Sequence, residues 1–348
     1  MPHRILIAST SLPPVAGGAE QAAWEVAKRL ANDLEVHVLT CARHVNSGER
    51  LSVHRVPRVA LKTLFYSTLG APKIYRLLKM TRPEVVHSHM VLPWGYVLRN
   101  SESKKVITCH GSDVFPKKPY PMKYFVMSAL QKSDAISAPS KWLSTYVEEK
   151  YGLPCRFIPN GVDTERFRPI EGLNKRSNVV LFVGRFIRRK GVMELVRAAK
   201  ELPQYEFWLV GNPGAKGAVE LPSLPNIKEI GFVDVNRLVS YYNEATICAF
   251  PSHWENAPVV GLEAMACGRP LVATRLGFSE FVENGREGIL VPPRDAKELV
   301  DAIRYLMENE DVRRRFEQNA RKRAMQYDWG VIAQEYRALY KHLLGGSP

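Results

Sequence analysis

Cysteine is scarce in this sequence, with 5 in 348 residues. A disulfide framework needs an even set of cysteines, and a zinc site needs ligands at short spacings. We therefore expect neither, and we expect the protein to work in a reducing cytoplasm. The five are far apart, without a Cys-x-x-Cys pair: Cys41, Cys109, Cys155, Cys248 and Cys267.

Long apolar runs are also missing. No stretch of about 18 consecutive apolar residues occurs, so we expect no membrane-spanning helix. Residues 1–8 are too short for a signal peptide and predict a first buried strand. The content of 45% hydrophobic and 24% charged residues is typical of a globular protein, and the length predicts two domains.

Two common ligand signatures are absent as well. The sequence has no Asp-x-Asp pair and no histidine–aspartate cluster with metal-ligand spacing, so we expect no metal site. The glycines after the first expected strand do not form Gly-x-Gly-x-x-Gly, so the dinucleotide-binding fingerprint is missing.

Positive charge is in excess and unevenly distributed, with a net charge of +14. Residues 1–174 hold 24 Lys and Arg against 14 Asp and Glu, whereas residues 175–348 hold 25 against 21. A basic first half predicts an anionic partner: a membrane surface, a phosphorylated substrate or nucleic acid. Simple solubility would account for the charge as well. We expect no nucleic acid, because no motif interleaves aromatic and basic residues along a groove.

Short apolar runs alternate with helical patterns from end to end, which predicts the α/β class with parallel sheets covered by helices on both faces. The pattern restarts after an aperiodic stretch, so we place a domain boundary near residue 170. The expected strands are residues 4–8, 35–39, 51–56, 84–87, 105–108, 135–138, 156–158, 178–183, 206–210, 226–230, 246–250, 271–273 and 288–291. The expected helices include residues 19–31, 69–80, 122–132, 141–150, 193–200, 235–243 and 258–266, and the chain is helical from residue 296, with a break near 328–330.

Two glutamates, Glu255 and Glu263, follow the expected strand 246–250. Pro258 suits the first helical position, and Gly268 suits the position just past the helix end. Glu255 would then lie outside the helix N-terminus, and Glu263 one to two turns inside. A helix N-terminus favours a phosphate, and a carboxylate beside it suits sugar hydroxyls. The alternative is two solvated glutamates on an ordinary βαβ unit.

Three further motifs also follow expected strands. Gly17 and Gly18 open a helix and allow close backbone approach to an anion, or else form a plain turn. His110 is placed for proton handling or sugar contact, although a lone loop histidine is more often structural. Arg185 and Lys190 bracket a tight loop and suit a diphosphate clamp; a solvated basic loop is the alternative.

The order of these motifs resembles that of the retaining nucleotide-sugar glycosyltransferases of the group-1, family-four type, which have the GT-B fold. The block from Glu255 to Gly268 is the specific part, and Pro159-Asn160-Gly161-Val162-Asp163 matches the interdomain segment of that family. The resemblance implies two Rossmann-like domains facing across a cleft. Residues 1–170 would bind the acceptor and residues 171–328 the donor, and a last helix, about residues 329–348, would return to the first domain.

The resemblance also implies roles for individual residues. Glu255 and His110 would be catalytic: Glu255 contacts hydroxyls of the donor sugar, and His110 touches that sugar or the acceptor. Glu263 would hold the ribose, and Arg185 and Lys190 the diphosphate. The full implied donor-binding set is Gly17, Gly18, Arg185, Lys190, Asn256, Ala257, Pro258, Val259 and Glu263, in which Pro258 donates no hydrogen bond.

The implied reaction moves a hexose-type sugar from a nucleoside diphosphate sugar to a glycan or lipid-linked acceptor, with retained configuration and without a metal or cofactor. A nucleotide-sugar epimerase of the same fold is the nearer alternative; it would not depend on an added acceptor. A basic nucleic-acid-binding protein is the distant alternative. The sequence departs from the family at Asn256-Ala257-Pro258 and at Leu276-Gly277-Phe278. These departures leave the sugar and the base of the donor open.

Residues 117–127 interleave three lysines with aromatic residues and methionines. Basic residues beside an apolar helical face suit an anionic leaflet. We therefore expect a peripheral membrane surface there, on the cytoplasmic side. An ordinary amphipathic helix covering the sheet is the alternative.

Overall fold

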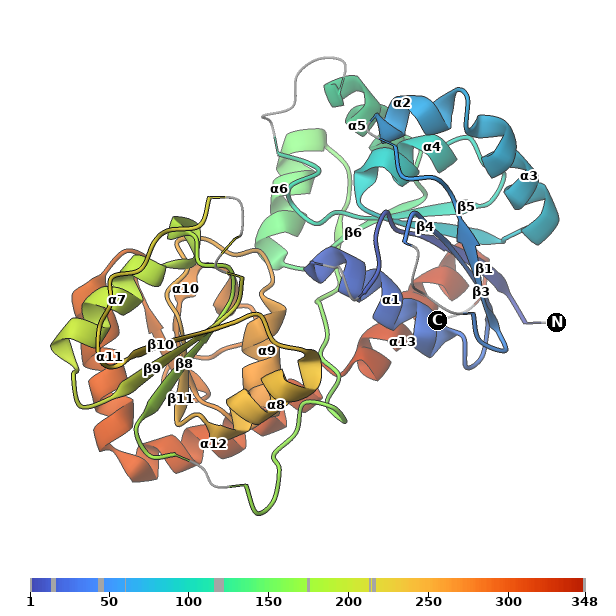
Figure 1. The fold of residues 1–348 in the computed structure, drawn as a ribbon. Coiled ribbons are helices and arrows are strands. Elements are labelled where there is room, and N and C mark those ends of the chain that lie inside the picture. The colour runs from blue at the N-terminus through green and yellow to red at the C-terminus, as the bar shows by residue number, and fades with distance from the viewer. Residues whose placement is uncertain are drawn as a thin grey trace. The chain divides into compact units, whose positions relative to one another are not determined.

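The computed structural model of the protein describes residues 2–13, 17–42, 47–59, 61–115, 122–173, 176–212, 214 and 217–346. The chain divides into two compact units (Figure 1). Unit 1 contains Met1–Asn160 together with Trp329–Pro348, and unit 2 contains Gly161–Asp328. In the described part of the chain, no helix is long and apolar enough to cross a bilayer.

The boundary between the units lies after Asn160, earlier than the expected residue 170. The backbone N–H of Val162 already donates to the carbonyl of Tyr327, at 2.8 Å. Phe167 is buried in the apolar core of unit 2. The stretch 161–170 lacks periodicity because it is anchored by individual contacts rather than by one helical or strand face.

Unit 1 is built on a parallel sheet in the order β3-β2-β1-β4-β5-β6-β7. The apolar residues of β1 are fully buried on both faces, and such strands have continuous apolar runs. The strands are β1 (Arg4–Ala8), β2 (Glu35–Thr40), β3 (Leu51–Arg55), β4 (Val85–His89), β5 (Lys104–Thr108), β6 (Ala135–Ala138) and β7 (Arg156–Phe157).

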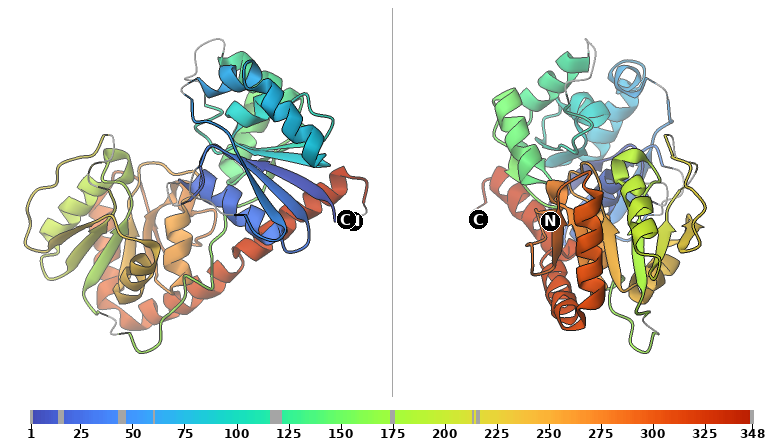
Figure 2. Two further views of the ribbon diagram at one scale, coloured as in Figure 1. Left: turned by 45° about the vertical axis from the view of Figure 1, so that its right-hand side comes forward. Right: turned by 90° about the vertical axis from the view of Figure 1, so that its left-hand side faces the viewer.

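Helices cover both faces of this sheet. One face carries α1 and α13, which lie side by side (Figure 2). The other face carries α2 to α6 and a π-helical turn, η1. The bounds are α1 (Gly18–Leu30), α2 (Lys62–Ser67), α3 (Ala71–Thr81), η1 (Val91–Gly95), α4 (Tyr96–Leu98), α5 (Met122–Gln131), α6 (Lys141–Tyr151) and α13 (Trp329–Leu343).

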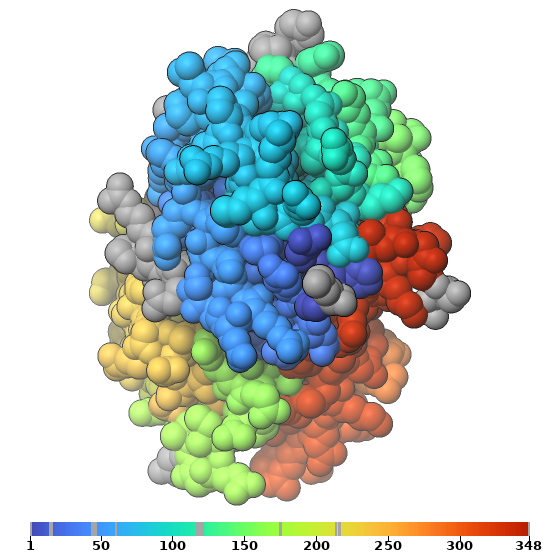
Figure 3. All heavy atoms as spheres, turned by 90° about the vertical axis from the view of Figure 1, so that its right-hand side faces the viewer, coloured from blue at the N-terminus to red at the C-terminus, as the bar shows by residue number. Residues whose placement is uncertain are grey.

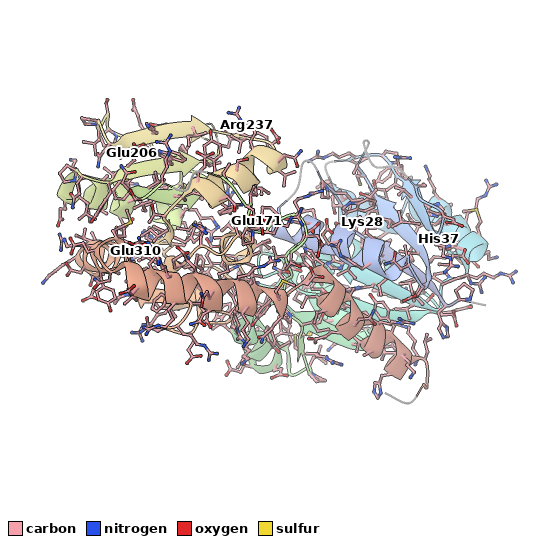
Figure 4. All side chains as sticks on the ribbon, turned by 90° about the horizontal axis from the view of Figure 1, so that it is seen from below. Lys28, His37, Glu171, Glu206, Arg237 and Glu310 are labelled. Atoms are coloured by element: carbon pink, nitrogen blue, oxygen red, sulfur yellow. The ribbon has the colours of Figure 1, made fainter. Side chains whose placement is uncertain are left out.

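Unit 2 repeats the plan with a parallel sheet in the order β10-β9-β8-β11-β12-β13. Its strands are β8 (Val179–Val183), β9 (Glu206–Val210), β10 (Ile227–Gly231), β11 (Ile247–Phe250), β12 (Leu271–Thr274) and β13 (Gly288–Val291). Its helical segments are η2 (Arg188–Lys190), α7 (Val192–Glu201), α8 (Val235–Glu244), α9 (Val259–Ala266), α10 (Arg275–Phe278), α11 (Ala296–Glu308) and α12 (Glu310–Met325). Figure 4 shows α12 running along unit 2 from Glu310.

The structure corrects the expected helix 69–80, which is preceded by a separate short helix, α2, and begins at Ala71. Gly70 lies between the two helices, and a Cβ there would approach Tyr66 Cδ1 to 2.8 Å. The segments η1 and α4 were not predicted. Their apolar side chains, from Val91 to Leu98, are buried apart from the half-buried Val97 and therefore show no clear helical period.

Helix α13 is attached to the sheet of unit 1 by buried hydrogen bonds. The hydroxyl of Tyr340 lies 2.6 Å from His87 Nδ1. The hydroxyl of Tyr336 lies 3.2 Å from Thr108 Oγ1. Since buried polar groups are costly without partners, these bonds fix the helix at one position on the sheet.

We expect Tyr340→Phe to destabilise unit 1 by about 1–3 kcal/mol, because the buried His87 Nδ1 loses this partner. Urea denaturation followed by tryptophan fluorescence would measure the effect. Tyr305→Phe is the matched control, since Tyr305 is 47% exposed. Equal denaturation midpoints for the two variants would contradict this role for the hydroxyl.

Candidate active site

The loops after β8, β11 and β12 meet at one edge of the unit 2 sheet, because the carboxyl ends of parallel strands lie together. The backbone N–H of His253 donates to the carbonyl of Arg189 at 2.8 Å. Arg189 Nη1 donates to the carbonyl of Trp254, also at 2.8 Å. Thr274 Oγ1 donates to the carbonyl of Ser252 at 2.7 Å. These bonds join the three loops into one surface.

Glycine permits the closest approach between these loops. Gly191 has φ +73°, and a Cβ there would lie 1.9 Å from the carbonyl oxygen of Pro251. Gly277 has φ +91°, and its Cβ would lie 2.6 Å from the carbonyl oxygen of Glu255. Any other residue at either position would force the loop that carries Glu255 to move. Gly277 thus supports the site, a role that we did not assign to it from the sequence.

Glu255 is held in place by neighbours from two loops. Its Oε1 accepts a hydrogen bond from Ser252 Oγ at 2.9 Å and forms an ion pair with Lys190 Nζ. Arg189 Nη1 lies 3.9 Å from its Oε2. The side chain is only 10% exposed. The carboxylate therefore has a fixed orientation and remains close to positive charge.

The sequence assigned Lys190 to the diphosphate and Glu255 to the sugar. The structure brings the two together, so the positive charge of Lys190 is partly neutralised by the carboxylate of Glu255. Arg185 differs, because it lies exposed in the loop directly after β8. Of the two expected clamp residues, Arg185 is the more accessible.

Helix α9 begins at Val259, one position later than expected. Pro258 occupies the N-cap position with extended backbone angles, φ −74° and ψ 106°, and not the first helical position. Pro258 and Val259 are buried, while Asn256 and Ala257 are half-buried in the loop before the helix. These residues thus immediately precede or begin the helix, whose N-terminus carries partial positive charge.

Glu263 lies within α9 and is 7% exposed. The hydroxyl of Tyr242, from α8, donates to Glu263 Oε2 at 3.1 Å. Burial raises the pKa of Tyr242 well above its ordinary value, and the negative charge of Glu263 raises it further. Tyr242 therefore remains a hydrogen-bond donor that orients the carboxylate. No motif in the sequence pointed to Tyr242.

In unit 1, Gly17 is the N-cap residue of α1 and Gly18 is its first residue, as expected. The N–H of Gly17 donates to Glu20 Oε2 at 3.1 Å, so this N-terminus already has an acidic cap. A bound anion here would have to overcome the negative charge of Glu20. The sequence interpretation did not include Glu20.

His110 is half-buried and follows β5. Its backbone N–H donates to Asp113 Oδ1 at 3.0 Å, and Asp113 Oδ2 accepts from the N–H of Val91 at 2.9 Å. The ring atoms His110 Nε2 and His89 Nδ1 lie 3.3 Å apart. His110 is therefore part of a polar cluster and not a lone loop histidine. The His-x-His pattern of β4 and an aspartate three residues after His110 were the available signals.

The histidines of this cluster are neutral near pH 7. Burial lowers the pKa of His87 to about 3 and lowers that of His89 well below its ordinary value. Burial also lowers the pKa of His110, although the charges of Asp113 and Glu20 oppose the shift. A neutral imidazole offers one donor and one acceptor, which suits contact with a hydroxyl.

Among the residues that the structure describes, no group of three or more His, Cys, Asp and Glu side chains is arranged to hold a metal ion. The five cysteines are buried and unpaired with one another.

Residues 163–323 match the family described as "Glycosyl transferases group 1", and residues 16–166 match "Glycosyltransferase Family 4". The chain belongs to this group of GT-B glycosyltransferases. An uncharacterized glycosyltransferase of Methanocaldococcus jannaschii is 29% identical over 342 residues, which cover 95% of this chain and 96% of that protein. This similarity extends over both units of the glycosyltransferase.

Two solved structures show the same fold. Sucrose-phosphate synthase from Thermosynechococcus elongatus has a TM-score of 0.84 at 24% identity, covering 99% of this chain and 100% of that one. HepE from Anabaena, solved in complex with UDP-glucose, has a TM-score of 0.77 at 20% identity, covering 97% and 99%.

We expect Arg185→Ala to weaken nucleoside diphosphate binding by about 10- to 100-fold, the cost of one lost charge-assisted hydrogen bond. Calorimetric titration with UDP and with GDP measures this without an acceptor. Arg188→Ala is the matched control, because Arg188 is an exposed cation of the same loop. Equal affinity in both variants would remove Arg185 from the donor site.

Proposed function

We propose that the protein is a retaining hexosyltransferase that moves a sugar from a nucleoside diphosphate to a glycan or lipid-linked acceptor. One observation carries the proposal: Lys190, the fixed Glu255 carboxylate and the N-terminus of α9 lie on one sheet edge. The structure of HepE with UDP-glucose supports a nucleotide-sugar donor of hexose type. We further propose that transfer needs no metal ion or cofactor.

The difficult step is to develop positive charge on the anomeric carbon while the diphosphate departs. Arg185, Lys190 and the α9 N-terminus would stabilise the departing negative charge. The carboxylate of Glu255 would stabilise the positive charge of the sugar or orient its hydroxyls. Its ion pair with Lys190 and the hydrogen bond from Ser252 would keep it correctly placed for either task.

A same-face reaction accounts for retention without a second carboxylate. The bond from the anomeric carbon to the phosphate oxygen breaks, and the bond to the acceptor oxygen forms on the same face. The acceptor hydroxyl gives its proton to the departing phosphate oxygen. His110, neutral near pH 7, would hydrogen-bond the donor sugar or the incoming acceptor.

The nucleoside end of the donor would be held by Glu263. An ionised carboxylate accepts hydrogen bonds from two neighbouring hydroxyls, which suits a ribose. Tyr242 would fix the direction of that carboxylate. Unit 2 would thus bind the donor and unit 1 the acceptor, while Gly17 and Gly18 stay predicted donor-binding residues and His110 a predicted catalytic residue.

The cytoplasmic location and the membrane surface at residues 117–127 stay predictions, and residues 117–121 lie outside the described part of the chain. In the described remainder, Lys123 and Tyr124 are exposed. Val126 is buried, and the ring of Phe125 lies 4.6 Å from that of Tyr96. Within the described residues of this segment, Phe125 and Val126 therefore pack on the core, which favours the alternative of an amphipathic helix covering the sheet.

We expect the product to keep the anomeric configuration of the donor. UDP-glucose is the first donor to test, and the proton NMR coupling of the new anomeric position reads the configuration. An inverted product would contradict the same-face reaction. Formation of an epimeric nucleotide sugar without any acceptor would support the epimerase instead.

Activity should persist in excess EDTA, because Arg185, Lys190 and the α9 N-terminus supply the charge that a metal ion would otherwise provide. Initial rates with and without chelator test this. Complete loss of transfer, reversed by added magnesium or manganese, would show that the reaction depends on a metal ion.

A further inference from the structure

Residues 50–83, which contain β3 and most of the segment that leads to β4, have charge of one sign only. Between Glu49 and Glu84 the sequence contains no acidic residue. The same stretch contains the cations Arg50, Arg55, Arg58, Lys62, Lys73, Arg76, Lys79 and Arg82. The proposed transfer reaction uses none of them.

Large apolar side chains are exposed on the same segment. On α2 and at its start, Leu61 is 71% and Leu64 is 54% exposed. Leu69, between the helices, is 82% exposed, and on α3 Tyr75 is 60% and Met80 is 66% exposed. Single exposed apolar residues are ordinary on protein surfaces, whereas a group of them marks an interaction site.

The outer face of α3 combines both features. Ile74, Leu77 and Thr81 are buried against the unit. The helical spacing places five exposed residues around the opposite side of α3. In order around the helix they are Tyr75, Lys79, Arg76, Met80 and Lys73. Lys79 Nζ lies 4.7 Å from the ring centroid of Tyr75, so one of these cations lies against an exposed aromatic ring. Within the described residues, no ion pair joins Lys73, Arg76 or Lys79 to a carboxylate.

This face is supported from below by packed aromatic residues. Tyr66, on α2, is 1% exposed and stacks on Trp94, with ring centroids 4.8 Å apart. The close approach at Gly70 fixes α2 against the start of α3. In Figure 3 the light-blue atoms of this segment form part of the outer surface of unit 1. The exposed side chains of α2 and α3 thus extend from helices that are packed against the core of unit 1.

We propose that the α2–α3 face, formed by Leu69, Lys73, Tyr75, Arg76, Lys79 and Met80, docks onto an anionic lipid bilayer. At helical spacing, Arg76 and Lys79 lie between Tyr75 and Met80, so cations separate the apolar side chains of this face. Lipid phosphates can gather around such cations, and the tips of Leu69, Tyr75 and Met80 can enter the headgroup region. Docking would favour a lipid-carried acceptor; that link rests on the proposed function, whereas the docking itself does not.

The test is co-sedimentation of the full chain with vesicles of phosphatidylcholine, alone or mixed with phosphatidylglycerol. Binding should need the anionic lipid and fall with added salt. The triple variant Lys73→Glu, Arg76→Glu, Lys79→Glu should bind about 100-fold more weakly, from about three lost lipid contacts. The variant Leu69→Ser, Tyr75→Ser, Met80→Ser should also bind more weakly, at unchanged net charge.

The matched control is Arg197→Glu, Lys200→Glu, Lys297→Glu, which makes the same charge change at exposed positions of unit 2. This control should retain most of the binding. If the control lost as much vesicle binding as the α2–α3 variant, net charge alone would explain the binding, and the proposal would be overturned. Binding to phosphatidylcholine alone at full strength would overturn it too.

Two further arms separate the competing explanations. If Lys117→Glu, Lys118→Glu, Lys123→Glu abolishes binding while the α2–α3 variants bind normally, the docking surface is residues 117–127 instead. Tighter capture of an RNA oligonucleotide than of anionic vesicles would also overturn the proposal.

Thermal melting with and without UDP confirms that each variant folds and retains its donor site. Loss of lipid binding with an intact UDP shift therefore leaves the proposed transfer reaction untouched. Should either α2–α3 variant not fold, Lys73→Gln, Arg76→Gln, Lys79→Gln replaces it and should still bind more weakly.

Discussion

The ion pair between Lys190 and Glu255 is the interaction on which the candidate site depends. A carboxylate that is only 10% exposed needs a counter-charge, and Lys190 supplies it from a neighbouring loop. That pairing requires the loops after β8 and β11 to approach closely, which Gly191 permits. The fixed orientation of Glu255 follows from this arrangement, while Arg185 in the same loop as Lys190 stays exposed.

Unit 1 is organised around neutral polar groups instead. His87, Tyr340, Thr108 and Tyr336 form buried hydrogen bonds between the sheet and α13, a helix distant in sequence. The low pKa of His87 follows from this burial, because a charged imidazole would be poorly solvated there. His110 lies at the accessible end of the same cluster. The buried hydrogen bonds of His87 and Thr108 thus attach the last helix, while burial separately lowers the pKa of His110.

The sequence predicted much of the fold and only part of the site. Apolar runs located the buried central strands, such as β1 and β8, but periodicity missed η1 and α4, most of whose side chains are buried. Motifs identified Glu255 and Lys190 separately; their pairing joins residues 65 positions apart and depends on strand order. Tyr242 could not be found in this way, because its role arises only from packing between α8 and α9.

The protein uses positive charge in two different ways. At the carboxyl edge of the unit 2 sheet, Lys190 is paired with a carboxylate, so its charge is local and its geometry is fixed. On the α2–α3 face, lysines and arginines lie on a segment without acidic residues and are mixed with exposed apolar groups. A fixed pair can position one small anion for chemistry, whereas unpaired, flexible cations can adapt to many phosphates on a surface. The difference in pairing, and not the amount of charge, therefore distinguishes the proposed catalytic site from the proposed docking face.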